Sequence, residues 1–86
     1  MMSNDERIGE IVHYYHKISV AVIKLNRSLH VGDKIHFLGA HTDFLQEIRS
    51  MQIEHEIVEE AKAGDEVAVK VDRRVRRGDT SFRPAE

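Results

Sequence analysis

Apolar and polar residues alternate along most of this chain with the two-residue period that is typical of β-strands. The clearest run covers residues 18–25 and is rich in β-branched side chains on both faces, which favours a central or strongly curved strand. Further strands are predicted at residues 8–15, 33–38, 66–71 and 80–83, separated by polar or glycine-containing turns. The pattern therefore predicts an all-β domain.

One stretch, residues 43–63, is ambiguous. Its apolar residues recur at helical spacing: Phe44, Leu45, Ile48 and Met51. Gly64 could end such a helix, so periodicity alone slightly favours a helix. The competing interpretation is a strand from residue 44 that continues to residue 54, followed by a polar connection at residues 56–63. We predict the strand, on the basis of a family resemblance given below.

A Gly-Asp pair recurs three times, each time directly before an extended run. The three pairs are Gly32-Asp33, Gly64-Asp65 and Gly78-Asp79. Glycine adopts the positive φ that many tight turns require, and aspartate is common at turn boundaries. The recurrence predicts three similar entries into strands.

The length of 86 residues indicates one small domain, which we place at residues 8–84 after a flexible tail at residues 1–7. The chain has no cysteine, which permits a reducing, cytoplasmic location and excludes disulfides and thiolate metal sites. Its longest apolar run is too short to span a membrane, and its polar, acidic start is unlike a signal peptide. We therefore expect a cytoplasmic protein with no membrane partner.

Charge is distributed unevenly although the net charge is only −2. Residues 54–66 contain six acids and one base, whereas four arginines follow closely: Arg73, Arg74, Arg76 and Arg77. Arginine matches the geometry of phosphate and carboxylate, so these four are the candidate binding residues for RNA or a partner. The alternative is a solvated edge that discourages aggregation of strands. If they lie on a strand, only two of the four should point the same way.

The sequence contains no clear pattern of residues for catalysis or for metal binding. The only close histidine pair is His13 and His16, which on a strand would face opposite ways, and no cysteine is available to complete a zinc site. No Ser-His-Asp or Cys-His order suggests a nucleophile. Tyr14, Tyr15 and Phe44 could stack on bases, although packing is the commoner role of aromatic residues. We expect no enzyme activity, no catalytic residue, no metal and no cofactor.

Several segments together resemble the second domain of translational GTPases such as elongation factor Tu and initiation factor two. The matching segments are V-A-V-I-K-L (20–25), L-H-V-G-D-K-I (29–35), S-M-Q-I-E-H (50–55), E-A-K-A-G-D-E-V-A-V (60–69) and R-R-G-D (76–79). The resemblance implies a small closed six-stranded Greek-key barrel, in which residues 49–54 form a strand. A similar barrel is appended to some collagenase-like peptidases, which is a weaker parallel without the catalytic part.

The same resemblance implies a non-enzymatic module of the translation machinery, with tRNA, ribosomal RNA or a translation-related protein as partner. The chain lacks the G-x-x-x-x-G-K-[ST] loop, so it cannot bind GTP by that family's route. It also lacks the Arg-Gly loop of the factors, where His16-Lys17 stands instead. The alternative function is a protein–protein interaction barrel with no role in nucleic-acid binding.

Overall fold

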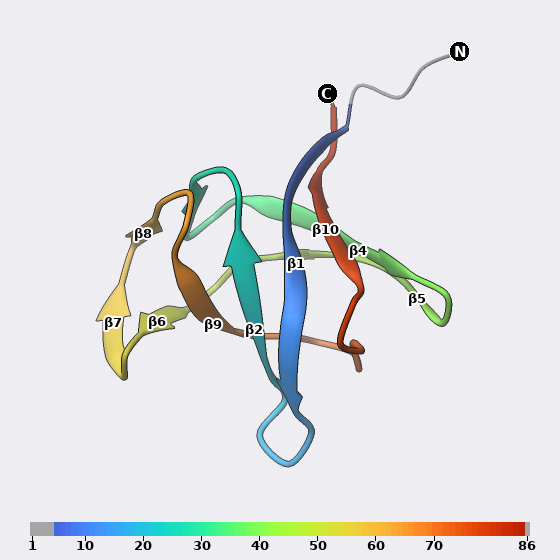
Figure 1. Cartoon of the computed structure of the whole chain (residues 1–86), viewed down its shortest axis with the longest axis horizontal. Helices are drawn as coiled ribbons and strands as arrows, with labels where there is room; N and C mark the ends of the chain where they lie inside the picture. Colours follow the sequence, from blue (N-terminus) through green and yellow to red (C-terminus); the bar gives the residue numbers. More distant parts are fainter. Residues whose placement is uncertain (1–4, 86) are drawn as a thin grey trace.

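The computed structural model describes residues 5–85, and within that range it contains ten β-strands and no helix (Figure 1). The strands are β1 (Glu6–Tyr15), β2 (Val20–Leu25), β3 (Leu29–His30), β4 (Lys34–Gly39), β5 (Thr42–Glu47), β6 (Met51–Ile53), β7 (Glu56–Val58), β8 (Glu60–Ala61), β9 (Glu66–Lys70) and β10 (Thr80–Arg83). The all-β prediction is therefore confirmed.

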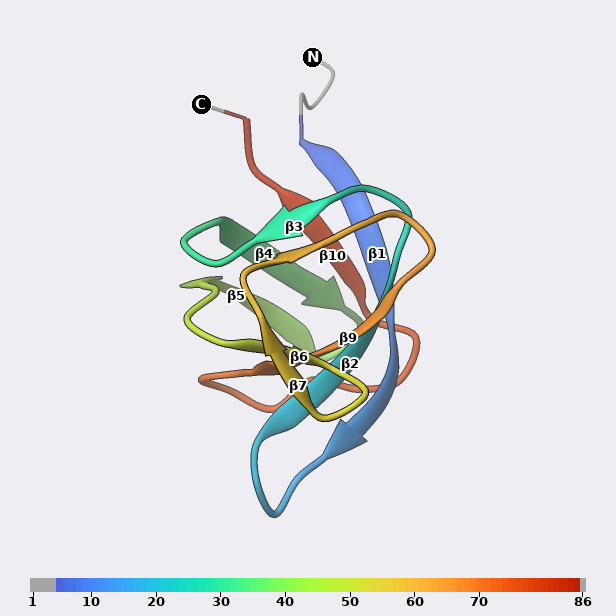
Figure 2. The same ribbon diagram turned by 90° about the vertical axis from the view of Figure 1, so that its left-hand side faces the viewer.

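Eight strands form one antiparallel sheet in the order β5-β4-β10-β1-β2-β9-β6-β7, and β3 pairs with β8 in a small second sheet. Figure 2 shows the large sheet curving around a common interior. Strand β1 makes this curvature possible, because its register shifts between Arg7 and Gly9 and again between Ile11 and His13. Such bulges bend a strand and increase its twist, so the first half of β1 pairs with β10 and its second half reaches along β2.

The predicted closure into a six-stranded barrel is wrong, because β5 and β7 are open edges of the large sheet. Within the described part of the chain, no backbone ladder joins the β5 edge to the other half of the sheet. Side-chain hydrogen bonds and the small sheet cover the gap between them. The buried Gln46 of β5 donates to the Lys70 carbonyl at 3.0 Å and accepts from the Asp72 amide at 2.7 Å. Farther along, the Val31 amide donates to the Glu59 carbonyl beside β3 and β8.

The boundaries of the predicted elements differ from the structure in three places. The strand interpretation of the ambiguous stretch is correct, but the chain forms two separate strands there, β5 and β6. The predicted polar connection at residues 56–63 is wrong, since it contains β7 and β8. The first strand begins at Glu6, and the part of the predicted tail at residues 1–4 lies outside the described residues.

The core lies inside the curled sheet and under the small sheet. It is built by alternation: Ala21 and Ile23 of β2 and Val67 and Val69 of β9 are buried, while their neighbours face outward. The remaining buried apolar residues are Ile8, Ile11, Leu25, Leu29, Ile35, Phe37, Ile48, Met51, Ala61, Val71 and Val75. Tyr14 and Phe44 pack against this core, as expected for most aromatic residues.

The three Gly-Asp pairs form the same turn, which confirms the predicted similarity of three strand entries. Each glycine has a positive φ: 99° at Gly32, 96° at Gly64 and 94° at Gly78. In each turn the aspartate amide donates to the carbonyl three residues earlier, and the aspartate side chain accepts from the amide of that same residue. The chain then enters β4, β9 and β10 respectively.

Each turn is also joined to a buried residue of another segment by two backbone hydrogen bonds. The glycine amide donates to the carbonyl of the buried residue. The amide of the buried residue in turn donates to the aspartate carbonyl. The buried residues are Ile48 for the first turn, Leu25 for the second and Ile11 for the third, and all six bonds are between 2.7 and 2.9 Å. The turns thus hold distant parts of the chain in register.

Asp79 differs from the other two aspartates because it is buried. Its Oδ2 atom accepts from the Thr42 hydroxyl at 2.5 Å and from the Arg76 amide at 2.8 Å. Gly39 leaves room for this carboxylate, since a Cβ atom at Gly39 would collide with Asp79 Oδ1. The third turn is therefore fixed to the β4–β5 hairpin as well as to β1.

We expect Asp79→Ala to lower the free energy of unfolding by about 3 kcal/mol, because it removes two hydrogen bonds to a carboxylate and leaves the buried Thr42 hydroxyl without a partner. The matched variant Asp65→Ala removes the equivalent carboxylate from a more exposed turn and should cost about 1 kcal/mol. Urea denaturation measures both values. Equal losses would contradict the role of burial at Asp79.

The β6–β7 hairpin turns through Glu54 and His55, whose φ angles are 51° and 68°. Two-residue hairpin turns with positive φ at both positions favour Asn-Gly, because other side chains are strained there. The double variant Glu54→Asn, His55→Gly should raise the free energy of unfolding by about 1 kcal/mol. The control Glu54→Gln, His55→Gln removes the same two ionisable side chains without relieving the strain. A similar gain in that control would show that charge repulsion, and not the backbone, limits stability.

Candidate functional site

The predicted arginines lie in the loop between β9 and β10, and a single apolar residue positions them. Val75 is 1% exposed and inserts into the core between the two arginine pairs. At the end of the loop, Gly78 and Asp79 bond to the backbone of Ile11 in β1. Because the loop is attached at both points, the arginines project from a defined backbone.

Three of the four predicted residues, Arg74, Arg76 and Arg77, line one hollow of about 540 Å³ together with His13, His16 and Tyr14. We call this hollow the arginine groove. The expectation that only two arginines would share a side assumed a strand, whereas the segment is an irregular loop that folds around Val75. Arg73 is exposed on the same loop but does not line the groove.

The two histidines reach the groove because His16 lies in the turn after β1 and not on the strand itself. As strand residues, the two histidines would face opposite ways, so the strand interpretation does not predict that they line the same groove. Within residues 5–85, no group of three or more histidine, aspartate and glutamate side chains is arranged to hold a metal ion. The groove is a basic surface with one aromatic wall, which Tyr14 forms.

A second surface, which sequence reasoning missed, is the outward face of β1, β2, β9 and β6. One cross-strand row pairs Val22 with Ala68, and Ala68 with Gln52. Beside it, Tyr15 pairs with Val20. We call these five residues the outer face.

Two shallow hollows of about 480 and 490 Å³ lie on the outer face, and Tyr15, Gln52, His55 and Ala68 line both of them. Tyr15 is 49% exposed, and Ile18 at the margin is 56% exposed. Tyr15 and Ile18 are the large apolar side chains that are exposed at this surface. Alternation places Val20, Val22 and Ala68 at positions that face away from the core, but only the pairing of β1, β2, β9 and β6 brings the surface together.

The described part of the chain contains no helix that is long and apolar enough to cross a membrane.

No model of a protein family matches this sequence. Among curated proteins, it is 47% identical over 76 residues to an uncharacterized protease of Methanocaldococcus jannaschii, an alignment that covers 87% of this chain and 19% of that protein. It is 28% identical over 78 residues to a collagenase of Porphyromonas gingivalis, covering 88% of this chain and 22% of the collagenase. The chain thus spans about a fifth of the length of the curated relatives it matches.

Two crystal structures share the fold. Both are of the C-terminal domain of a candidate U32 peptidase from Geobacillus thermoleovorans, and one is its selenomethionine variant. The variant superposes with a TM-score of 0.84 at 22% identity, covering 88% of this chain and 96% of that domain. The other gives 0.85 at 21% identity, covering 94% and 93%. The chain has the fold of that C-terminal domain.

These comparisons overturn the resemblance to the second domain of translational GTPases. The relatives are a protease and collagenases, and the matching structures are a peptidase domain. The predicted role in translation rested on that resemblance, and the RNA-binding hypothesis rested on the resemblance together with the arginine run; the protease and collagenase relatives overturn both. The physical reason is that Gly-Asp turns before valine-rich strands specify a backbone geometry, and a backbone geometry does not specify function.

Val75 provides a test of how the arginine loop is held. Val75→Ala should lower the free energy of unfolding by about 2 kcal/mol, because it leaves a cavity where the loop enters the core. The control Val31→Ala alters a valine that is 40% exposed and should change stability by less than about 0.5 kcal/mol. Chemical denaturation of both variants checks this, and a loss at Val75 no larger than at Val31 would exclude the anchoring role.

Proposed function

We propose that this chain is a non-catalytic accessory domain of the U32-peptidase type, which binds to a peptidase polypeptide and supports its action on protein substrates. The observation that carries this proposal is the 47% identity over 76 residues to one fifth of a protease. The match in fold to a domain described as C-terminal in a candidate U32 peptidase adds to it. In this proposal the catalytic groups belong to the other four fifths of such a protein.

The composition of this chain supports a role without catalysis. It has no cysteine, and its described residues include no set of side chains arranged for a metal ion. Two hollows on the surface, the arginine groove and one beside Leu45, are open and shallow, unlike the deep clefts that exclude water from most active sites. We also propose a cytoplasmic location, which the cysteine-free composition permits.

The outer face is the surface that we assign to the peptidase polypeptide. Val20, Val22 and Ala68 form an apolar centre, and the aromatic ring of Tyr15 borders it. Contact surfaces between domains have apolar, aromatic-rich centres with polar rims. Here Gln52 and Lys70 supply polar groups at the edge of the same two cross-strand rows.

Co-expression with a U32-type catalytic polypeptide from the same organism tests the proposal. We expect the two chains to purify together, and we expect the small chain alone to leave gelatin uncleaved. Failure to form a complex at micromolar concentrations, or gelatin cleavage by the small chain alone, would contradict the proposal.

The matched variants Ile18→Glu and Leu45→Glu separate the outer face from a general effect of surface charge. Both side chains are exposed and apolar, at 56% and 63%, but Leu45 lies on β5 and lines a different hollow. Ile18→Glu should weaken the complex at least about tenfold, because it brings a charge to the margin of a desolvated contact. Leu45→Glu should leave the affinity unchanged, and equal weakening would exclude the outer face as the docking surface.

A further inference from the structure

The eight arginines of the chain divide into two groups by whether a carboxylate compensates them. Four form ion pairs: Arg7 with Glu10, Arg27 with Glu6, Arg49 with Asp72, and Arg83 with Glu6 and Asp33. The other four are Arg73, Arg74, Arg76 and Arg77, and none of their guanidinium groups has a carboxylate partner within residues 5–85. Every arginine without a partner in that range thus lies in one loop.

The two acidic residues of that loop bind groups other than its four guanidinium groups. Asp72 pairs with Arg49, and its amide donates to Gln46. Asp79 is buried and accepts from Thr42 and from the Arg76 amide, so it does not reach a guanidinium group. Asp72 stays half exposed but is paired with Arg49, so neither acid of the loop compensates its four guanidinium groups.

The arginine groove concentrates this charge in one open hollow of about 540 Å³, which the side chains of a polypeptide can enter from solvent. Three guanidinium groups with five N–H donors each can bind carboxylates in forked pairs. Tyr14, which is partly buried, gives the groove an apolar wall, against which the aliphatic stem of an acidic side chain can pack.

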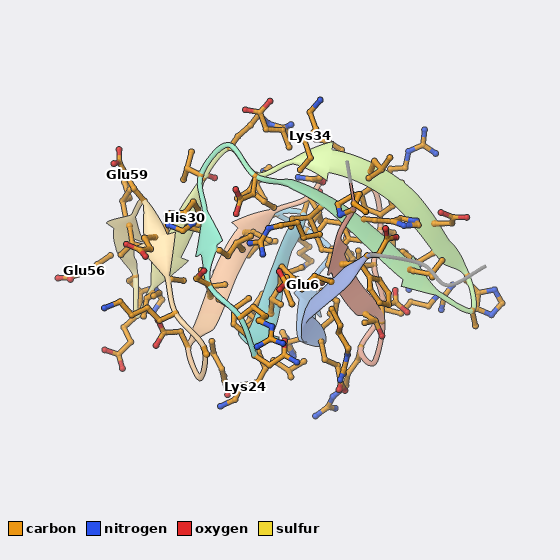
Figure 3. All side chains as sticks on the ribbon, turned by 90° about the horizontal axis from the view of Figure 1, so that it is seen from above. Glu6, Lys24, His30, Lys34, Glu56 and Glu59 are labelled. Atoms are coloured by element: carbon orange, nitrogen blue, oxygen red, sulfur yellow. The ribbon has the colours of Figure 1, made fainter. Side chains whose placement is uncertain are left out.

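We propose that the arginine groove binds an acidic segment of a partner polypeptide, through carboxylates paired with Arg74, Arg76 and Arg77. A polypeptide is favoured over RNA because the rest of the molecule repels a long polyanion. Glu54, Glu56 and Glu59 are exposed around β7 without an ion-pair partner in the described part of the chain. Figure 3 shows Glu56 and Glu59 pointing outward at the β7 end of the molecule. A short acidic segment avoids that end, whereas a long nucleic acid would meet it.

This binding site depends on the arginines alone and does not require docking to a peptidase. The test uses the full chain and a fluorescent peptide of eight glutamates, with eight-residue lysine and serine peptides as comparisons. We expect the glutamate peptide to bind at 50 mM salt and to weaken as salt rises, because screening reduces attraction between exposed charges. No binding at 50 mM salt, or equal binding of the serine peptide, would overturn the proposal.

A charge-matched pair of variants locates the site. Arg74→Ala, Arg76→Ala, Arg77→Ala together should weaken binding at least about tenfold, since each lost forked pair removes charge-assisted hydrogen bonds. The control Lys24→Ala, Lys34→Ala, Lys62→Ala removes the same net charge from other strands and turns and should change affinity less than about twofold. Equal losses of affinity in the two variants would show that only the bulk charge attracts the peptide, and would overturn the proposal that the arginine groove is the binding site.

Two further measurements are needed. One shows whether the arginine variant keeps its fold, and the other shows whether the groove prefers a polypeptide or a nucleic acid. Circular dichroism and the midpoint of urea unfolding should be unchanged in the arginine variant, because its side chains make no hydrogen bond or ion pair within residues 5–85. An eight-nucleotide single-stranded RNA should bind more weakly than the glutamate peptide at equal salt. Tighter binding of the RNA would overturn the choice of a polypeptide ligand.

Discussion

Three pairs of backbone hydrogen bonds join segments of this fold that are distant in the sequence. In each, a Gly-Asp turn is joined to the backbone of a buried apolar residue, Ile48, Leu25 or Ile11. A curled sheet with two open edges needs such links, because its ladder alone does not bring its two ends together. The positive φ of glycine allows the turn, and the aspartate carboxylate closes it from within. Strands β4, β9 and β10 begin directly after these turns, and the arginine loop ends at the third of them.

Much of this architecture could be predicted from the sequence, because its signals are local. Alternation identified β1, β2, β4, β9 and β10, and the Gly-Asp pairs marked three of the turns. Closure could not be predicted, since it depends on Gln46 meeting the backbone near Lys70 and Asp72, 24 and 26 residues away. The β6–β7 hairpin was also missed. Glu54 and His55 are not residues typical of turns, and their positive φ angles accompany the pairing of β6 with β7. The resemblance to translation factors failed for a related reason, as local turn geometry does not determine ancestry or function.

The candidate sites show the same division between local and distant information. The run of arginines was visible in the sequence, as was its basic character. Its arrangement was not, because Val75 makes the segment a loop folded into the core, and Asp72 and Asp79 bind partners outside the loop. The outer face depends on several strands lying side by side, so no single segment reveals it.

The positions of the two ends of the domain have a mechanical consequence. Glu6 of β1 pairs with Arg83 of β10, and the Ala85 amide donates to Asp5, so the chain enters and leaves at one point (Figure 1). Antiparallel strands pulled from the same end separate one hydrogen bond at a time, like a zipper, whereas strands sheared lengthwise must break many at once. When tension is applied through its two ends, this domain should therefore open at low force from the β1–β10 pair, while the three turns deeper in the fold stay intact longest.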